Sequence, residues 1–380
     1  MNTSSGAAKE EIKITHIDIY KLNIELHEPF VIAVGTQWDS KCIAIKIHTN
    51  HNIYGVGEAS PILVLQGETQ ETSFEMAKMF SKVLIGKSPL EIEKRIAEIN
   101  SITPWNYAIK SAFDMALYDI ASKYAGMPLY KFLGGANDKL LIIDKTVTIN
   151  TPEIMAEKAK KIVDEGITEI KVKLGRSPIE DILRIKTIRE KIGNEIPIKI
   201  DANQGWILSD ALQVLNGIKE YNIEYAEQPL HKDDIKGMAK ISALSPIPIM
   251  ADESVFDHRD AMRLVKNDAC TFFNIKLSKS GGIFNALKIL AIAEAADIKC
   301  QVGCMMETRV GLSALSHLAM ASKMIVYYDI DSNFLLTEDP VIGGIQFVEN
   351  KRWILPESHG IGADFDPEYL KKMEMFTVKD

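Results

Sequence analysis

The feature that most constrains the fold is a short apolar segment followed by a helical segment, a pattern that repeats from about Leu141 onward. The apolar segments are predicted strands, and the segments between them place apolar residues at helical spacing. The predicted strands are TVTI, EIKVKL, IPIKID, IEYAEQ, IPIMAD, CTFFNIK, IKCQVG and MIVYYDID. The predicted helices cover residues 156–163, 182–192 and 211–218 and lie near Met238, Ala261, Ala286 and Leu315. This series predicts an α/β fold in which a parallel sheet, covered by helices, closes into a TIM-like barrel.

An open, doubly wound parallel sheet is the alternative fold for such a repeat. Sheets of that kind that bind dinucleotides carry a G-x-G-x-x-G turn after their first strand. The repeat has no such turn at that point. The barrel is therefore favoured over a dinucleotide-binding fold.

The first third of the chain has a different pattern. Residues 14–57 alternate apolar and polar side chains as half-buried antiparallel strands do, and residues 72–124 return to helical spacing. We therefore predict an α+β domain over residues 8–136 and a barrel over 137–339. Alternation returns after Asp339, so the tail 340–380 is expected to complete the first domain.

Charge and cysteine content restrict the partners and the compartment. The net charge of −8 argues against nucleic acid and anionic membranes, which favour a basic surface. Cys42, Cys270, Cys300 and Cys304 have neither the spacing of a zinc finger nor the density of a disulfide scaffold, which suits a reducing compartment. The sequence shows no signal peptide or membrane span, so we expect a cytoplasmic protein.

Three carboxylates stand where successive predicted strands end: Asp201, Glu227 and Asp252. Taken singly, an aspartate at such a place caps a helix more often than not. In a barrel, however, the carboxyl ends of the strands meet on one face, where active sites are built. Three hard oxygen ligands in one desolvated opening suit octahedral Mg²⁺ better than zinc, so we predict one Mg²⁺ per subunit.

Lysines end strands on both sides of the predicted metal site. Lys171 and Lys173 are two residues apart and share a face of an early strand, and Lys276 ends a later strand. A divalent cation and a second ammonium would lower a lysine pKa enough for it to act as a base. Lys279 lies beyond its strand and is expected to be solvated or to support a loop. Two bases facing one carbon are the expected result.

This arrangement suits removal of a proton from carbon beside a carboxylate. A carbon acid of that kind is very weak, so the enediolate that forms must be held by a metal and a neighbouring cation. The predicted site supplies both.

These residues resemble the enolase superfamily, and specifically its muconate-lactonising subgroup, across nearly the whole chain. The resemblance is carried by GMPLYKFLGG at 126–135, Lys171-Val-Lys173, DANQGW at 201–206, Glu227-Gln-Pro229, ADES at 251–254 and Asn274-Ile-Lys276. It implies an N-terminal α+β capping domain over a (β/α)₇β barrel. It also implies Mg²⁺ on Asp201, Glu227 and Asp252, and acid/base lysines Lys173 and Lys276.

Within that subgroup, Asp329-Ile-Asp331 on the last strand is similar to the D-x-D of dipeptide epimerases, where paired carboxylates hold the substrate's ammonium. The resemblance implies epimerisation of an L,L-dipeptide at the α-carbon of its C-terminal residue, by 1,1-proton transfer through an enediolate. Two solvated acids at a strand end are the plainer interpretation. We also expect Thr146 on the first barrel strand and Met305 after the seventh to contact the substrate.

The side-chain preference is predicted from the capping loops. Relatives that act on Ala-Glu carry an arginine where this chain has Gly35, so an acidic second side chain would lack a partner. Asp39 and Glu68 lie in these loops and favour cationic or neutral side chains, although simple solvation explains both residues equally well. Glu307 and Arg309 receive no role from the sequence.

Other functions share some of these residues. A cycloisomerase, an N-acylamino-acid racemase or an o-succinylbenzoate synthase would use the same metal and lysines but would not need Asp329 or Asp331. A barrel glycosidase would explain Glu227 and Asp252 but not the lysines, and intact acid/base residues argue against a binding protein. We further expect a small-molecule substrate, no nucleic-acid or membrane partner, and a homo-oligomer.

Overall fold

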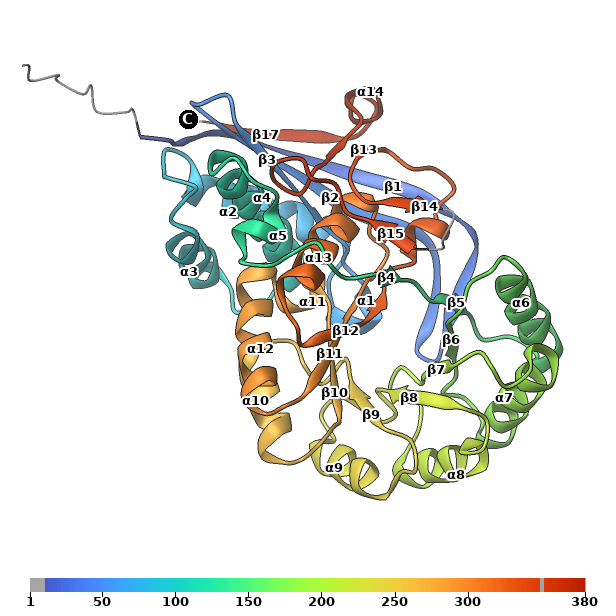
Figure 1. The fold of residues 1–380 in the computed structure, drawn as a ribbon. Helices are drawn as coiled ribbons and strands as arrows, with labels where there is room; N and C mark the ends of the chain where they lie inside the picture. Colours follow the sequence, from blue (N-terminus) through green and yellow to red (C-terminus); the bar gives the residue numbers. More distant parts are fainter. Residues whose placement is uncertain (1–10, 349–351, 380) are drawn as a thin grey trace, which may run out of the picture.

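Two sheets organise the chain in the computed structural model, which describes residues 11–348 and 352–379 (Figure 1). The first is an antiparallel sheet in the order β17-β1-β2-β3. Its strands are β1 (Ile14–Ile32), β2 (Gly35–Thr49), β3 (Tyr54–Ala59) and β17 (Met375–Lys379). Alternate isoleucines such as Ile17, Ile19 and Ile45 form a core with α2 (Gln70–Leu84), α3 (Ile92–Ile102) and α4 (Tyr107–Tyr124). The predicted α+β capping domain is confirmed.

The second sheet has eight parallel strands in sequential order, β5 to β12. They are β5 (Lys145–Val147), β6 (Ile170–Lys173), β7 (Ile198–Asp201), β8 (Ile223–Glu227), β9 (Ile249–Ala251), β10 (Phe272–Ile275), β11 (Lys299–Gly303) and β12 (Ile325–Asp329). Seven of them lie within strands predicted from the sequence, and β5 overlaps the predicted TVTI but begins one residue earlier. Because neighbouring strands run parallel, their carboxyl ends lie on the same side of the sheet.

Helices surround this sheet on its outer side (Figure 1). They are α6 (Pro152–Asp164), α7 (Pro178–Ile192), α8 (Leu208–Ile218), α9 (Ile235–Leu244), α10 (His258–Lys266), α12 (Ile283–Ala295) and α13 (Arg309–Ala321). Thr146 of β5 donates a backbone hydrogen bond to Asp331 Oδ2 beyond β12, at 2.9 Å, so the first and last strands meet. The predicted barrel architecture is confirmed, and no helix among the described residues is long and apolar enough to cross a membrane.

Short elements connect the two parts. They are α1 (Leu63–Gln66), α5 (Leu129–Phe132), α11 (Leu277–Ser280), α14 (Pro367–Leu370), the 3-10 turn η1 (Ser332–Phe334), β4 (Leu141–Ile142), β13 (Val341–Gly343), β14 (Gln346–Val348), β15 (Arg352–Ile354) and β16 (Ala363–Phe365). Of these, α1 and α11 lie beside the site described below.

The tail only partly follows the expectation that it completes the first domain. β17 pairs with β1, and Asp364 of β16 forms an ion pair with Lys46 of β2 at 3.0 Å. However, β13 pairs with β16, and β14 and β15 form a small sheet with β4. Alternation alone does not identify the partner of a strand, since the same pattern suits any half-buried sheet. Residues 8–10 of the predicted domain lie outside the described residues.

Candidate active site

The three predicted metal ligands lie together at the carboxyl ends of neighbouring strands. Asp201 and Glu227 are opposite one another in the register of β7 and β8, and Asp252 directly follows β9. All three are buried. Asn274 Nδ2 and Gln301 Nε2 donate to the two oxygens of Glu227, at 2.9 and 3.2 Å, which fixes the orientation of its carboxylate.

The electrostatics of these carboxylates fit a divalent cation. Burial raises the pKa of Glu227 to about 7, and the negative charges of Asp201 and Asp252 add to this rise, which Lys171 opposes. Burial would also raise the pKa of Asp201, but Lys173 and Lys171 hold it below its ordinary value. Mutual repulsion among buried oxygen ligands is relieved when they share a hard cation, so the residues present suit Mg²⁺.

Lysines reach these carboxylates from two sides. Lys171 Nζ lies 2.8 Å from Glu227 Oε2 and 2.6 Å from Asp329 Oδ2. Lys173 Nζ is 2.6 Å from Asp201 Oδ2. From the other side, Lys276 Nζ lies 2.9 Å from Asp252 Oδ2. Lys173 and Lys276 therefore pair with different carboxylates of the group, Asp201 and Asp252.

The neighbouring carboxylates raise the pKa of two of these lysines. Burial alone would lower the pKa of Lys171, but Asp329 and Glu227 raise it well above its ordinary value. The pKa of Lys276 is likewise raised, because Asp252 and Glu227 outweigh its burial. The protein's own carboxylates thus dominate the field at both of these lysines.

Lys279, which was expected to be solvated or to support a loop, is not solvated. It lies in α11 and is buried, and its Nζ donates to Asp252 Oδ1 at 2.6 Å and to the carbonyl of Asn274 at 2.9 Å. Together with Lys276 it holds the pKa of Asp252 well below its ordinary range, against the effect of burial. The sequence offered no sign of this contact, since Lys279 and Asp252 are remote in the chain.

The two aspartates at the end of β12 are also buried. Asp329 pairs with Lys171, whereas Asp331 accepts from the Thr146 backbone and lies 3.9 Å from the thiol of Cys304. Burial raises the pKa of Asp331, and the charge of Asp329 adds to it. An acidic pair short of one counter-charge is suited to a buried cation.

A cavity joins the aspartates to the lysines. Thr146, Lys173, Lys276, Met305, Asp329 and Asp331 all line it. The remaining lining residues are Phe30, Ile32, Gln37, Ile62, Leu65, Asn203, Cys304, Met306 and Leu335. Most of these come from the β1–β2 hairpin, α1 and the segment after β11. Leu65 of the capping loops and Asn203 of the DANQGW motif could be named from the sequence, whereas the others were missed because isolated apolar loop residues carry no periodic signal.

Two predicted substrate residues lie elsewhere. Asp39 is partly exposed and pairs with Lys41 at 3.3 Å. Glu68 lines a second cavity beside Trp105 and accepts from the Ala108 backbone at the start of α4, and burial raises its pKa to about 7. The structure does not bring either carboxylate to the cavity that holds the lysines.

Glu307 and Arg309, which the sequence left without a role, are supporting residues. Glu307 accepts from the Met305 backbone at 2.5 Å and so fixes the loop that lines the cavity. Arg309 pairs with Asp339 and donates to the carbonyls of Val341 and Ile345, which holds the start of the tail.

Comparisons with known proteins agree with this geometry. Residues 14–134 match the mandelate racemase and muconate lactonizing enzyme N-terminal domain, and residues 154–369 match the enolase C-terminal domain-like family. The D-Ala-D/L-Ala epimerase of Cytophaga hutchinsonii is 42% identical over 96% of this chain and 99% of its own length. The structure of a dipeptide epimerase from that organism, with Mg and D-Ala-L-Val, has a TM-score of 0.95 at 42% identity and covers 96% of this chain and 100% of its own.

Two further relatives show the range of activities nearby. The hydrophobic dipeptide epimerase of Enterococcus faecalis is 39% identical over 92% of this chain and 99% of its own length. The N-succinyl-L-Arg/Lys racemase of Bacillus cereus is 35% identical over 96% and 99%. The matched residues cover both parts of the fold, and the chain therefore belongs to the mandelate racemase and muconate lactonizing enzyme family of the enolase superfamily.

Proposed function

We propose that the chain is a magnesium-dependent isomerase that epimerises dipeptides at the α-carbon of the C-terminal residue. One observation carries the proposal: the buried pair Asp329 and Asp331 lines the same cavity as Lys173 and Lys276. The pair supplies a site for a free ammonium, and the lysines supply a site for proton transfer. The dipeptide epimerases with bound Mg and dipeptide among the relatives support it.

The substrate is oriented by charge at both ends. Asp331 and Asp329 hold its ammonium. At this end of the cavity, Lys171 already forms an ion pair with one carboxylate oxygen of Asp329. Asp201, Glu227 and Asp252 would hold Mg²⁺ beside the substrate carboxylate, and the bound ion supplies stabilisation of the negative charge that develops there. This leaves the α-carbon of the C-terminal residue between the lysines.

Lys173 and Lys276 then exchange the proton. One lysine, in its neutral form, accepts the α-proton at Nζ while the electron pair of the C–H bond moves into the carboxylate to form an enediolate. Asp252 and Glu227 raise the pKa of Lys276, and Mg²⁺ on these carboxylates would offset their charge and favour its neutral form. The opposite lysine, in its protonated form, delivers a proton to the other face of the same carbon, which inverts it. Lys171 remains protonated because Asp329 and Glu227 raise its pKa, and it contributes positive charge rather than a base.

The cavity favours dipeptides with apolar or small neutral side chains. Phe30, Ile32, Ile62, Leu65 and Leu335 contribute only hydrocarbon to its wall. A charged side chain against that wall would lose its water without gaining a partner. Asp39 and Glu68 do not line the cavity, so neither carboxylate supports the cationic preference predicted from the sequence.

The proposal is tested by incubating a library of L,L-dipeptides with the protein and Mg²⁺ in D₂O. Mass spectrometry and NMR are expected to show deuterium at the α-carbon of the C-terminal residue, with the fastest exchange for apolar or small side chains. Removal of Mg²⁺ with EDTA should stop the exchange and added Mg²⁺ should restore it. Absence of exchange with every dipeptide would end the proposal.

N-acylamino-acid racemisation is the second candidate, because one relative is an N-succinyl-amino-acid racemase. An N-acyl substrate has no ammonium, so it gains nothing from Asp331. We expect Asp331→Asn to reduce kcat/KM for dipeptides by about tenfold or more, the loss of one charge-assisted contact of ~1.5–3 kcal/mol. N-acylamino acids measured with the same variant are the control, and a larger loss on them would reverse the assignment.

A further inference from the structure

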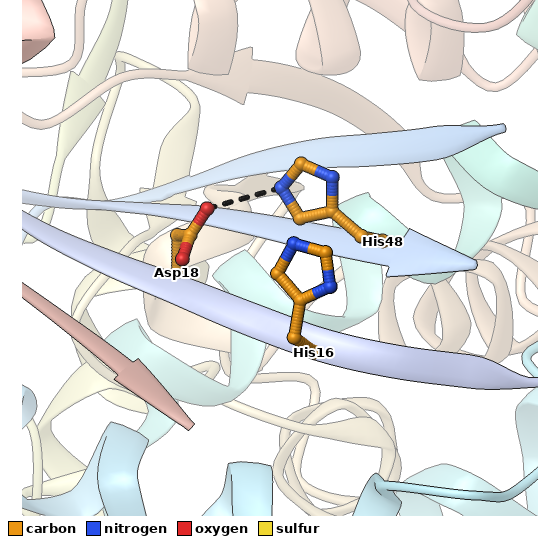
Figure 2. Close-up of side chains that lie close together, drawn as sticks. All are labelled: His16, Asp18 and His48. Atoms are coloured by element: carbon orange, nitrogen blue, oxygen red, sulfur yellow. Dashed lines mark hydrogen bonds and ion pairs between the residues drawn. The ribbon is translucent and has the colours of Figure 1, made fainter. Parts of the chain in front are cut away.

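A group of metal-ligating side chains lies on the cap sheet, apart from the active site. His16 and Asp18 of β1 and His48 of β2 project from the face opposite the isoleucine core, since residues two apart on a strand share a face (Figure 2). None of them lines the catalytic cavity. All three are partly buried, so water and ions reach them.

The backbone register brings the two imidazoles together. His16 and His48 are direct cross-strand partners, and their rings stack with centroids 4.1 Å apart. Asp18 follows on the same face, and its Oδ2 lies 3.1 Å from His48 Nε2 (Figure 2). One ligand atom from each of the three residues lies within 4.8 Å of the others. The positions are fixed by the sheet and not by a loop.

The surroundings hold Asp18 and leave room above it. Thr377 of β17 donates to Asp18 Oδ1 at 2.6 Å, which leaves Oδ2 directed to the histidines. A groove of about 480 Å³ opens beside the group, lined by Asp18, Tyr20, Lys46 and His48 and by residues from the tail that include Lys371. Lys46 lies across from Asp18 in the strand register and forms an ion pair with Asp364 at 3.0 Å.

We propose that His16, Asp18 and His48 form a second metal site, which binds one divalent transition-metal ion of the zinc class. Two imidazole nitrogens and one carboxylate oxygen are ligands that zinc, nickel and cobalt accept and that Mg²⁺ does not prefer. The ion replaces the His48–Asp18 hydrogen bond, after one ring turns so that both nitrogens face it. Water from the groove completes its coordination.

Such an ion would join the strands of the cap sheet. It links β1 to β2 directly, and Asp18 links it through Thr377 to β17, which comes from the other end of the chain. Binding to the folded state alone raises the free energy of unfolding. The site is therefore a stabilising metal site, independent of the Mg²⁺ that serves the reaction.

The experiment uses the full-length protein saturated with Mg²⁺, so that the catalytic carboxylates are occupied, and titrates it with Zn²⁺. The variants are His16→Gln and His48→Gln. The matched control is His231→Gln, because His231 also has an aspartate neighbour, Asp233 at 3.7 Å, but is not part of the group of His16, Asp18 and His48. Calorimetry measures bound Zn²⁺, and thermal unfolding measures Tm.

The wild type and His231→Gln are expected to bind one Zn²⁺ per chain and to rise in Tm, whereas both site variants lose that equivalent and the Tm rise. Equal Zn²⁺ binding by all four proteins would overturn the proposal. Diffraction at the zinc edge on wild-type crystals gives a readout that needs no variant. Anomalous density between His16, Asp18 and His48 supports the site, and density confined to other positions contradicts it.

Discussion

At the residue scale, Lys279 illustrates how a buried charge acts through its neighbour. Its Nζ contacts the Asp252 carboxylate and two backbone carbonyls, so every donor of the ammonium is used. Lys279 is a positioning residue: it fixes the carboxylate that is proposed to hold Mg²⁺, and it does not line the cavity.

Lys279→Met removes the donors while keeping the length of the side chain. Asp252 then loses one of its two lysine partners, and residues that orient a metal ligand typically contribute 10–100-fold to metal affinity. We expect the Mg²⁺ concentration for half-maximal activity to rise by about that factor, measured by Mg²⁺ titration of deuterium exchange. Lys240→Met, at an exposed position of α9, is the control. Unchanged Mg²⁺ dependence would show that Asp252 does not need this contact.

The two lysines that are proposed to exchange the proton can be distinguished by the stereochemistry of their variants. Lys173→Ala removes the base on one flank and Lys276→Ala the base on the other, so each variant should lose inversion completely. Each should still exchange the α-proton of the single epimer whose hydrogen faces the remaining lysine. Proton NMR in D₂O on the separated epimers measures this, and loss of exchange with the same epimer in both variants would contradict a two-base arrangement.

At the scale of single elements, a buried histidine of α13 joins this helix to α5 and to the tail. His317 Nδ1 accepts from the Tyr130 backbone of α5 and Nε2 contacts the Ile361 carbonyl of the tail, both at 3.1 Å. These two contacts require a neutral ring with its proton on Nε2. Burial lowers the pKa of His317 to about 4.

The lowered pKa makes folding depend on pH. Above pH 6.5 the ring is neutral in the folded and the unfolded protein, and its full contribution to the free energy of unfolding is present. As the pH falls from 6.5 towards 4, the unfolded protein binds the proton first, so this contribution is lost. We expect protonation linked to His317 to lower the free energy of unfolding by about 2 kcal/mol between pH 7.5 and pH 5. Urea unfolding of the wild type and of His317→Gln, whose amide can serve both partners without titrating, measures the difference. Parallel pH curves for the two proteins would exclude His317 as the cause.

The elements themselves were largely predictable, whereas their partners were not. The eight barrel strands follow from short apolar runs between helices, and the parity of Lys171 and Lys173 correctly predicts a shared face. The contact of Lys279 with Asp252 and the pairing of β13 with β16 depend on approach in space, which one sequence does not encode locally. The apolar wall of the cavity was missed for the same reason, since Phe30 and Leu335 meet only in the folded chain.

At the scale of the whole molecule, the cavity exists only because the cap is held on the barrel. Ile62 and Leu65 of the cap line the same cavity as Met305 and Met306 of the barrel. Ser60 joins the two parts directly: its hydroxyl accepts from the Met306 backbone and its N–H donates to Ser278, both at 3.0 Å. The seam is therefore part of the proposed substrate site.

Glu58 is the charged residue at the centre of this seam. It is the last but one residue of β3 in the cap, and its buried carboxylate accepts from the N–H groups of Thr308 and Gly311 and from the Thr308 hydroxyl, at 2.8 to 2.9 Å. These donors form the start of α13 in the barrel, where the helix dipole favours a negative charge. The cap thus provides the anion for a barrel helix.

Glu58→Gln tests this link with little change of shape. An amide has one acceptor oxygen, so its NH₂ must face either the Thr308 N–H or the Gly311 N–H, and one buried donor is left unpaired. We expect the free energy of unfolding to fall by about 1–3 kcal/mol and KM for dipeptides to rise more than kcat falls, because the wall formed by Ile62 and Leu65 loses its anchor. The control is Glu75→Gln, which removes an exposed ion pair with Lys78 and should cost less than ~1 kcal/mol. Equal urea midpoints for the two variants, with an unchanged KM, would show that the cap is held on the barrel without Glu58.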